Sequence, residues 1–457
     1  MASLSKPAIE ELGALLGERL AIGDAIREHH GRDESPLPPA PPDAVAFVQS
    51  EEEVARILPI CVRYGVPVIP FGAGTSLEGH VLAASGGLCI DLTEMNEIVE
   101  VNVADLDATV QPGVTRTQLE ERLRGDGLFF PVDPGADATL GGMASTGASG
   151  TMTVRYGAMR ENVLSLRAVL PDGRVVSTGG RARKSSAGYD LTRLFVGAEG
   201  TLGVITQLTL RVYGIPEAIS GATCYFDSVD DAVAAVIVVL QTGIPVARIE
   251  FLDDMAMQAM NDFSSTSYAV APSLFFEFHG SEAAVRDDVN GVGQIAKEFG
   301  AMDFRSAIDL AERTKLWKAR HESFYSSLAL RPGSRAITTD VCVPISELPG
   351  CIASSRGDID ELNVTATTVG HVGDGNFHLM LLVDPDDQGE LERAEEVKRR
   401  LVERALAVGG TCTGEHGVGS RKITSLEKEA GDAIEVMRAI KGALDPAGVM
   451  NPGKVLR

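Results

Sequence analysis

Two histidines in the last quarter of the chain have the spacing expected of metal ligands. Residues 370–378 read Gly-His-Val-Gly-Asp-Gly-Asn-Phe-His. Asp374-Gly375 favours a two-residue hairpin turn, because a type I′ turn needs a positive φ at both central positions. Counting outward pairs His371 with His378, and directly opposed residues of antiparallel strands have Cβ atoms about 5 Å apart on one face. This register predicts that the two imidazoles converge on one point.

A Glu-His dipeptide offers a third ligand and a base. Glu415 and His416 lie between two glycines, and two neutral imidazoles with one carboxylate suit Zn²⁺, Mn²⁺ or Fe²⁺ in an open site. We therefore expect His371, His378 and Glu415 to bind a divalent metal. His416 would then lie beside the same pocket, where an imidazole with a pKa near ~6.5 can act as general base. The residues alone leave two alternatives open: a hydrogen-bonded histidine pair with an unrelated surface Glu415, and a structural or helix-capping His416.

Three glycine-rich loops indicate a cofactor. PFGAGTSLEGH at 70–80 follows an apolar strand, and its glycines let backbone N–H groups turn toward an anion. PVDPGADATLGGMASTGASG at 131–150 and GAEGTLGVIT at 197–206 are rich in small residues that permit close backbone approach. A Rossmann helix does not follow the first loop, and a P-loop lysine is missing. Each loop alone fits an ordinary turn, but three together favour a dinucleotide.

The elements that must position these residues fall into two patterns. Residues 1–30 show helical periodicity before a proline-rich stretch at 35–42, and short strands then alternate with turns from 44 to 215. After Pro216 the predicted order of strands and helices is β-α-β-β-α, which suggests a ferredoxin-like unit. The elements expected in this unit are strands 222–226, 246–251 and 274–279 and helices 229–241 and 282–299, and strands 336–343, 363–372 and 377–383 extend it. A charged helix at 388–408, a glycine-rich turn and a helix at 423–442 are expected after it.

Length and charge limit the function. A chain of 457 residues is expected to form two or three structural units. Lys plus Arg 41 against Asp plus Glu 64 gives 41 − 64 = −23, which disfavours nucleic acid and requires a dedicated cation for any acidic substrate. The six cysteines are scattered, as expected of reduced thiols. The longest clean apolar run, 232–240, falls short of the ~20 residues that span a bilayer. We expect a soluble cytoplasmic protein without a transmembrane segment, either free or peripheral to a membrane.

The glycine loops, GHVGDGNFH, GTCTGEHGVG and the closing NPGK together resemble a known family. The chain is similar over nearly its whole length to the FAD-linked D-2-hydroxyacid dehydrogenases of the vanillyl-alcohol-oxidase superfamily. Leu-Trp-Lys-Ala-Arg-His at 316–321 and Thr-Asp-Val-Cys-Val-Pro-Ile-Ser at 339–346 most resemble the D-lactate dehydrogenase (cytochrome) branch. The resemblance implies an α+β fold, with a PCMH-type two-subdomain FAD-binding domain and a ferredoxin-like cap domain that has an extended antiparallel sheet.

The resemblance also implies domain boundaries and cofactor contacts. The FAD-binding domain is expected at 1–215, with its N-terminal helix at 1–30 and its core at 44–215. The cap is expected at 216–408, and a C-terminal helical segment at 409–457 returns to the FAD domain. His80 is an option for a covalent flavin link, but this branch resembles noncovalent binders. The expected FAD-binding residues are Pro70, Gly72, Ala73, Gly74, Thr75, Ser76, Gly79, Pro134, Thr139, Gly142, Ser145, Gly147, Glu199, Gly203, Ile205 and Asn451.

By the same resemblance Arg320 binds the substrate carboxylate, although a helix arginine beside Trp317 is also typical of a solvated or stacking residue. Relatives that oxidise hydroxyglutarate tend to have a lysine near Thr338 and an asparagine near Met380. The hairpin register puts Met380 and Val369 on the histidine face, which predicts an apolar wall. The expected substrate is therefore D-lactate or a longer apolar D-2-hydroxy acid.

Several alternatives remain open for the activity and its partners. The chain could be a glycolate oxidase catalytic subunit or a D-2-hydroxyglutarate dehydrogenase. From other classes, it could be a noncatalytic FAD-binding subunit or a flavin-free metallohydrolase. Cytochrome c, electron-transfer flavoprotein and a quinone all fit as electron acceptor, and a homodimer is compatible with the sequence.

Overall fold

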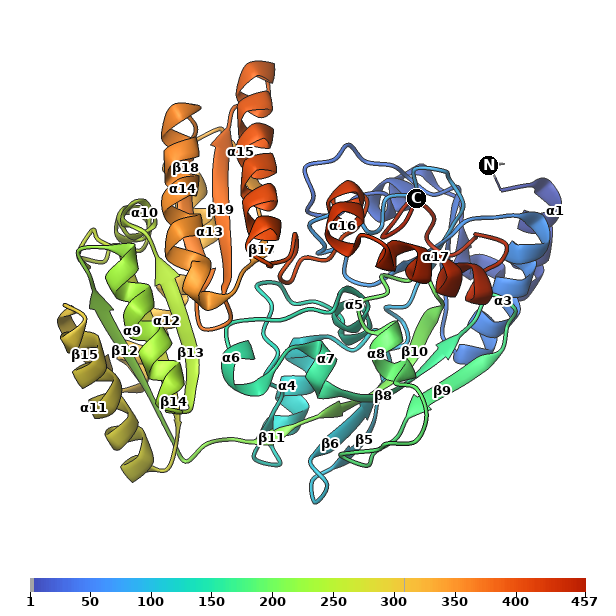
Figure 1. The fold of residues 1–457 in the computed structure, drawn as a ribbon. Helices are drawn as coiled ribbons and strands as arrows, with labels where there is room; N and C mark the ends of the chain where they lie inside the picture. Colours follow the sequence, from blue (N-terminus) through green and yellow to red (C-terminus); the bar gives the residue numbers. More distant parts are fainter. Residues whose placement is uncertain (1–3, 308) are drawn as a thin grey trace. The chain divides into compact units, whose positions relative to one another are not determined.

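The computed structural model describes residues 4–307 and 309–457, so residues 1–3 of the expected N-terminal helix lie outside the described residues. The chain forms two compact units (Figure 1). Unit 1 contains Met1–Ser149, Gly157–Ile215 and Glu415–Arg457, and unit 2 contains Gly150–Tyr156 and Pro216–Gly414. The expected core segment 44–215 is thus interrupted by seven residues that pack with unit 2, and residues 409–414 also belong to unit 2.

The N-terminal part of unit 1 is a small, mainly parallel sheet. Its strands are β1 (Leu20–Ala21), β2 (Ala44–Phe47), β3 (Val68–Phe71) and β4 (Leu88–Asp91), in the order β1-β2-β4-β3. The expected helix at 1–30 is two helices, α1 (Lys6–Leu16) and α2 (Asp24–His30), separated by the turn η1 (Gly17–Arg19) and by β1. Helix α1 ends before Gly17, whose φ of 59° is a backbone conformation that residues with an L side chain rarely adopt. Helix α3 (Glu51–Tyr64) begins at Ser50, whose side chain accepts a hydrogen bond from the Glu53 backbone N–H.

A second, antiparallel sheet of unit 1 has the order β5-β6-β10-β8-β9. Its strands are β5 (Ile98–Asn102), β6 (Asp107–Val110), β8 (Val163–Val169), β9 (Val175–Gly179) and β10 (Val204–Arg211), and the short strands β7 (Leu128–Phe129) and β11 (Tyr213–Gly214) pair separately. Ile440 and Leu444, near the chain end, pack on the core of this sheet. The C-terminal helices therefore return to unit 1. The remaining helices of this unit are α4 (Arg116–Arg124), α5 (Leu140–Thr146), α7 (Met159–Asn162), α8 (Leu191–Phe195), α16 (Ile423–Ala430) and α17 (Ala433–Leu444).

Unit 2 is built on one sheet whose main path is β15-β12-β14-β13-β18-β19-β16, with β17 also paired to β19. The strands are β12 (Ala218–Tyr225), β13 (Val246–Leu252), β14 (Ser273–Gly280), β15 (Met302–Ala307), β16 (Arg335–Thr338), β17 (Val341–Cys342), β18 (Thr365–His371) and β19 (Asn376–Val383). The part β15-β12-β14-β13, with helices α9 (Val229–Gln241) and α11 (Glu282–Glu298), has the ferredoxin-like order. The predicted α+β fold with an extended antiparallel sheet is confirmed.

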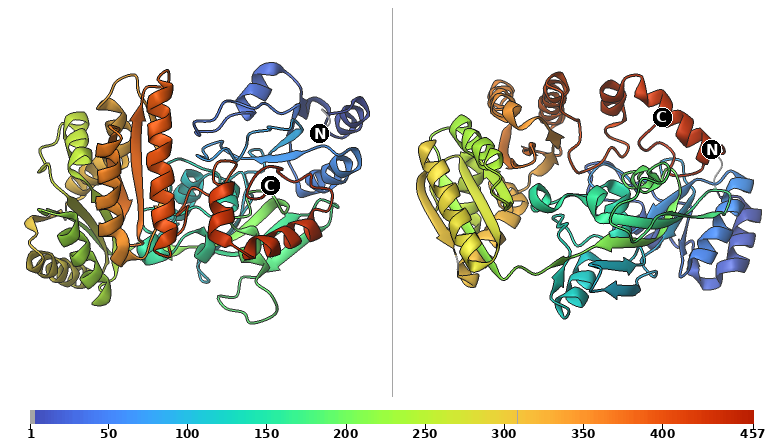
Figure 2. Two further views of the ribbon diagram at one scale, coloured as in Figure 1. Left: turned by 45° about the horizontal axis from the view of Figure 1, so that its top comes forward. Right: turned by 60° about the horizontal axis from the view of Figure 1, so that its bottom comes forward.

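Helices cover both faces of this sheet. Helices α9 and α11 lie side by side, and α14 (Leu348–Glu361) lies beside α15 (Gln388–Ala407) along the β18–β19 pair in both views of Figure 2. The turn η2 (Ile345–Glu347) precedes α14. On the other face, Leu252, Phe275, Val369 and Met380 join one buried apolar cluster with residues of α10 (Asp254–Ser264) and α12 (Leu310–His321). Helix α13 (Ser323–Ala329) and the short α6 (Thr153–Tyr156) complete the unit. Within residues 4–307 and 309–457, no helix is both long and apolar enough to cross a membrane.

Candidate active site

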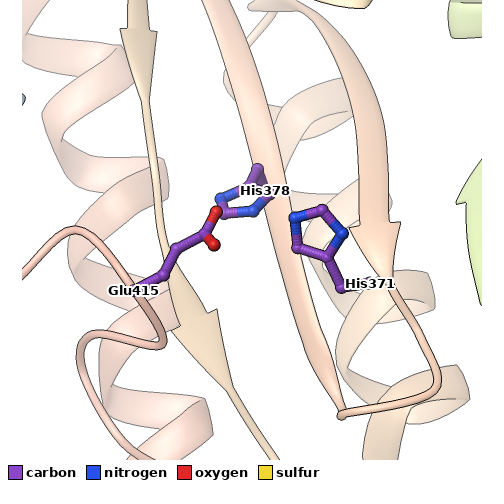
Figure 3. Close-up of side chains that lie close together, drawn as sticks. All are labelled: His371, His378 and Glu415. Carbon is purple, nitrogen blue, oxygen red and sulfur yellow. The ribbon is translucent and has the colours of Figure 1, made fainter. Parts of the chain in front are cut away.

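Three side chains meet in the arrangement predicted for a metal centre. One potential ligand atom from each of His371, His378 and Glu415 lies within 4.8 Å of the others. Figure 3 shows the two imidazoles on neighbouring strands with the Glu415 carboxylate pointing toward them. His371 ends β18, His378 lies in β19, and Glu415 follows Gly414, the last residue of unit 2. This donor set fits a divalent ion such as Zn²⁺, Mn²⁺ or Fe²⁺.

The predicted register of the hairpin was wrong, although the convergence it predicted occurs. His371 pairs with Asn376, and Val369 lies opposite His378. The Asp374 N–H bonds to the His371 carbonyl, and only Gly375 of the Asp-Gly pair has a positive φ, so the turn is longer than a two-residue type I′ loop. The slip amounts to two residues, which keeps both histidines on one face. The imidazole centroids lie 5.6 Å apart at an interplanar angle of 81°.

Both histidines are oriented through their Nδ1 atoms. His378 Nδ1 lies 2.9 Å from the Thr339 carbonyl oxygen, and His371 Nδ1 lies 2.6 Å from Glu250 Oε1. A carbonyl or carboxylate oxygen can only accept, so each Nδ1 carries the proton in these bonds. In a neutral imidazole Nε2 is then unprotonated, as a metal ligand must be. Outer partners of this kind fix the tautomer and the ring orientation of metal-binding histidines.

A buried polar network holds the segment that leads to Glu415. Asn376 Nδ2 donates to Asp340 Oδ1 at 2.8 Å, and Thr413 Oγ1 donates to Asp340 Oδ2 at 2.7 Å. A Cβ on Gly414 would lie 2.0 Å from Asn376 Nδ2, so the chain passes where only glycine fits. Glu415 itself accepts a 2.8 Å hydrogen bond from Ser149 Oγ.

Arg320 lies on α12, in unit 2, and is buried. Its Nη2 forms an ion pair with Glu250 Oε2, and its Nη1 donates to Ser323 Oγ at 3.3 Å. The buried Nε has no hydrogen-bond partner among the described residues. Arg320 is therefore a buried, ion-paired side chain and not a solvated one. Its binding of a substrate carboxylate stays a prediction.

His416, the predicted base, lies in unit 1 beside a buried carboxylate that the sequence analysis missed. Its Nδ1 is 3.7 Å from Glu78 Oε1, and Glu78 also pairs with Arg421 at 3.2 Å and Lys422 at 3.1 Å. Burial acts to raise the pKa of Glu78, but the polar contact with His416 and the charges of Lys422 and Arg421 outweigh it and lower the pKa to about 2. Glu78 is thus ionised at neutral pH.

The first two glycine loops contact each other in unit 1. A Cβ on Gly72 would lie 2.2 Å from Thr139 Oγ1, and Gly74 and Gly79 have φ values of 68° and 79°. Thr139 begins α5, where its side chain accepts a hydrogen bond from the Gly142 N–H. The loops therefore bring backbone N–H groups and small residues together, as a phosphate-binding cradle requires.

Glu199 and Asn451 join the third glycine loop to the C-terminal segment. Glu199 is buried and accepts hydrogen bonds from the backbone N–H groups of Val418 at 2.6 Å and Gly419 at 2.8 Å. Asn451 Nδ2 donates to the Glu199 carbonyl at 2.7 Å and to the His80 carbonyl at 3.2 Å. Asn451 Oδ1 and His80 Nδ1 are buried without hydrogen-bond partners among the described residues. Such atoms fit a large polar ligand that would satisfy them.

The other expected FAD-binding residues occupy three places in unit 1. Pro70 lies in β3, and Ala73, Thr75 and Ser76 follow it in the first loop. Pro134 precedes α5, Ser145 lies on it with Oγ bonded to the Gly141 carbonyl, and Gly147 ends it. Gly203 and Ile205 lie at the start of β10, where Ile205 is buried. Their contacts with FAD stay predictions.

Sequence reasoning missed Glu250 and the Asp340 network as well as Glu78. Glu250 is a lone acidic residue within the apolar strand β13, Val-Ala-Arg-Ile-Glu-Phe-Leu. Charged side chains are almost never fully buried unless they are paired, so this acidic residue in a central strand was a usable signal.

Comparisons with known proteins agree with this geometry. The family described as FAD-linked oxidases, C-terminal domain, matches residues 215–455, and an FAD-binding domain matches residues 42–179. A probable mitochondrial D-lactate dehydrogenase of Danio rerio is 53% identical over 96% of this chain and 89% of its own length. The mitochondrial D-lactate dehydrogenase (cytochrome) of Arabidopsis thaliana is 45% identical over 99% of this chain and 80% of its own length. A glycolate oxidase subunit of Bacillus subtilis is 34% identical over 99% of this chain and 97% of its own length.

Solved structures share the fold at low sequence identity. p-Cresol methylhydroxylase has a TM-score of 0.79 at 17% identity, covering 98% of this chain and 96% of its own. Alkyldihydroxyacetonephosphate synthase has a TM-score of 0.78 at 20% identity, and the match covers 98% of this chain and 84% of the synthase chain. The predicted family, the enzyme class and the FAD cofactor are confirmed. The chain therefore belongs to the FAD-linked oxidases, has the fold of the vanillyl-alcohol-oxidase superfamily, and groups with the D-lactate dehydrogenases of the cytochrome type.

Proposed function

We propose that the protein oxidises D-lactate, or a longer apolar D-2-hydroxy acid, to the 2-oxo acid with FAD and one divalent metal. The convergence of His371, His378 and Glu415, directly followed in sequence by His416, carries this proposal. The names of the relatives from Danio rerio and Arabidopsis thaliana support the substrate. Bound FAD would supply a hydride acceptor, and the bound ion would supply Lewis acidity.

The chain's own residues would bind and deprotonate the substrate. His371, His378 and Glu415 would hold the ion, and Arg320 would bind the substrate carboxylate through its guanidinium. His416 would take the hydroxyl proton, since one peptide bond joins it to the ligand Glu415. The FAD would be held noncovalently by the three glycine loops of unit 1 and by Asn451.

Val369 and Met380 support an apolar substrate side chain. Both lie on the strand face that bears the two histidines, and both are buried in an apolar cluster that includes Trp317. A distal carboxylate would gain no hydrogen bond from either side chain, so D-2-hydroxyglutarate is disfavoured. Glycolate stays the second candidate because of the 34% identity to a glycolate oxidase subunit.

Anaerobic mixing of the purified flavoprotein with each lactate enantiomer tests the proposal. D-lactate is expected to bleach the visible flavin absorbance, and L-lactate is expected to leave it unchanged. Full FAD content without reduction by any D-2-hydroxy acid would instead indicate a noncatalytic subunit. A protein purified without flavin, active as a metal-dependent hydrolase, would contradict the proposal entirely.

The electron acceptor and the location are separate proposals. Relatives named D-lactate dehydrogenase (cytochrome) support a cytochrome as acceptor, and reduction of cytochrome c by the D-lactate-reduced protein tests it. Those relatives are also named mitochondrial, whereas the sequence features predict a cytoplasmic location. Cell fractionation distinguishes the two locations. Light scattering of the purified protein measures the oligomeric state.

A further inference from the structure

Glu250 connects two residues that the proposed function requires. It lies in the middle of β13 and is fully buried, with 0% of its surface exposed. Its Oε1 accepts the hydrogen bond from His371 Nδ1 at 2.6 Å, and its Oε2 accepts from Arg320 Nη2. Each oxygen of this carboxylate therefore has a different partner.

Strand pairing puts Glu250 beside His371. Phe251 of β13 pairs with Gly370 of β18, and Leu252 pairs with Val369. The next position along each strand brings Glu250 next to His371 on the same face. The contact is therefore built into the register of two central strands and does not depend on a mobile surface side chain.

The carboxylate has a buried cation as its partner. Arg320, itself buried, forms an ion pair with Glu250 through Nη2. A buried ionised carboxylate needs partners of this kind, because an unpaired charge in the interior is strongly disfavoured. Arg320 thus keeps Glu250 available as an acceptor for His371.

We propose that Glu250 is a positioning residue that sets the metal affinity of the His371, His378 and Glu415 centre through the Nδ1–H of His371. This inference rests on the proposed function, because it requires that centre to bind a metal. A carboxylate acceptor on Nδ1 fixes the ring orientation, keeps Nε2 unprotonated and makes it a stronger donor to a cation. At His378, Nδ1 bonds to the Thr339 carbonyl at 2.9 Å, and the Asp340 carboxylate lies farther from it, at 3.9 Å. At His371 the carboxylate of Glu250 is itself the hydrogen-bond acceptor.

Metal titration of stripped protein tests this role without relying on turnover. Zn²⁺ and Mn²⁺ are titrated, in competition with a chelator of known affinity, into metal-free protein that retains FAD. Glu250→Ala is expected to weaken metal binding by roughly 10–100-fold, the usual cost of losing such a partner. Glu250→Gln keeps an acceptor oxygen but loses the charge, so its affinity should fall between those of Glu250→Ala and wild type.

Glu277 provides a matched control. It is buried on the neighbouring strand β14, accepts from His279 Nε2 at 2.9 Å, and lies 3.5 Å from Arg248 Nε. Glu277→Gln removes a buried, paired carboxylate from the same sheet without touching a metal ligand. It should lower thermal stability yet leave the metal dissociation constant unchanged.

The outcomes separate this inference from the proposed function. Wild-type metal affinity in Glu250→Ala, with FAD content retained, would overturn the role of Glu250. An equal loss of affinity in Glu277→Gln would also overturn it, since the effect would then be a general consequence of sheet damage. If His378→Ala binds metal as tightly as wild type, the proposed metal centre itself is wrong. If Glu250→Ala does not fold, the comparison of Glu250→Gln with Glu277→Gln decides the question.

Discussion

His371 and His378 are diagonal neighbours on β18 and β19, with Val369 rather than His371 directly opposite His378. Their rings are nearly perpendicular, at 81°, and do not stack. Because each Nδ1 is bonded to its own acceptor, each ring keeps its Nε2 atom for the proposed divalent cation. The Glu415 carboxylate would bind the same ion.

Removal of one imidazole should therefore release the metal and leave the flavin bound. His378→Ala is expected to lower metal affinity by more than the roughly 10–100-fold cost of losing an outer partner, and to abolish flavin reduction by D-lactate. Metal content by atomic emission and FAD content by absorbance measure the two effects separately. His279→Ala, which removes another buried histidine of the same sheet, should keep the metal. A variant His378→Ala that retains a full equivalent of tightly bound metal would exclude His378 as a ligand.

Gly414 should be intolerant of a side chain because of where the chain passes. A Cβ there would lie 2.0 Å from Asn376 Nδ2 and 3.0 Å from Asp340 Oδ1, so Gly414→Ala must displace the network that precedes Glu415. We expect a loss of about 1–3 kcal/mol of stability, typical of overpacking, together with weaker metal binding. Gly350→Ala is the control, since nothing lies within 4 Å of a Cβ at that helical position. Thermal unfolding and metal titration measure both effects, and unchanged metal affinity in Gly414→Ala would show that Glu415 is positioned by other contacts.

Much of this arrangement could be predicted from local patterns. Helix α9 has the predicted bounds, Val229–Gln241, because Ser228 caps its first turn and apolar residues follow at helical spacing. The histidines converge despite the wrong register, because side chains in a strand alternate with a period of two. The turn itself could not be predicted. The Val343 N–H bonds to the Gly375 carbonyl, and a Cβ on Gly375 would lie 2.0 Å from the Val343 oxygen. A contact from a distant segment thus decides the turn geometry.

The outer partners of the site were beyond prediction for a similar reason. Glu250 lies 121 positions from His371 in the sequence, and Glu78 lies 343 positions from Arg421. Their pairing depends on strand order and on the return of the C-terminal segment to unit 1, neither of which is encoded in a local pattern. Only the presence of an acidic residue in an apolar strand hinted at Glu250.

Glu78 should make the stability of the protein sensitive to acid. Its pKa is lowered from an ordinary value of 4.5 to about 2, so its contribution is present above pH 4.5 and is lost as the pH falls toward 2. The shift corresponds to about 3 kcal/mol. Glu78→Gln should therefore be less stable than wild type at neutral pH, and the difference in unfolding temperature should shrink as the pH falls from 5 to 3. A difference that stays constant over this range would mean that Glu78 is not ionised in the folded protein.

The apolar wall proposed for the substrate site should be convertible to a polar one. Thr338 of β16 lies directly opposite Met380 of β19, so Thr338→Lys with Met380→Asn would introduce a cation and an amide at paired positions on the histidine face. We expect the ratio of kcat/KM for D-2-hydroxyglutarate to that for D-lactate to rise by at least tenfold, about 1.4 kcal/mol, because a distal carboxylate would gain a charged partner. Met257→Asn, a polar substitution in the same buried cluster on α10, should lower stability without changing the ratio. If the double variant loses D-lactate activity but the ratio stays fixed, Met380 does not line the substrate side chain.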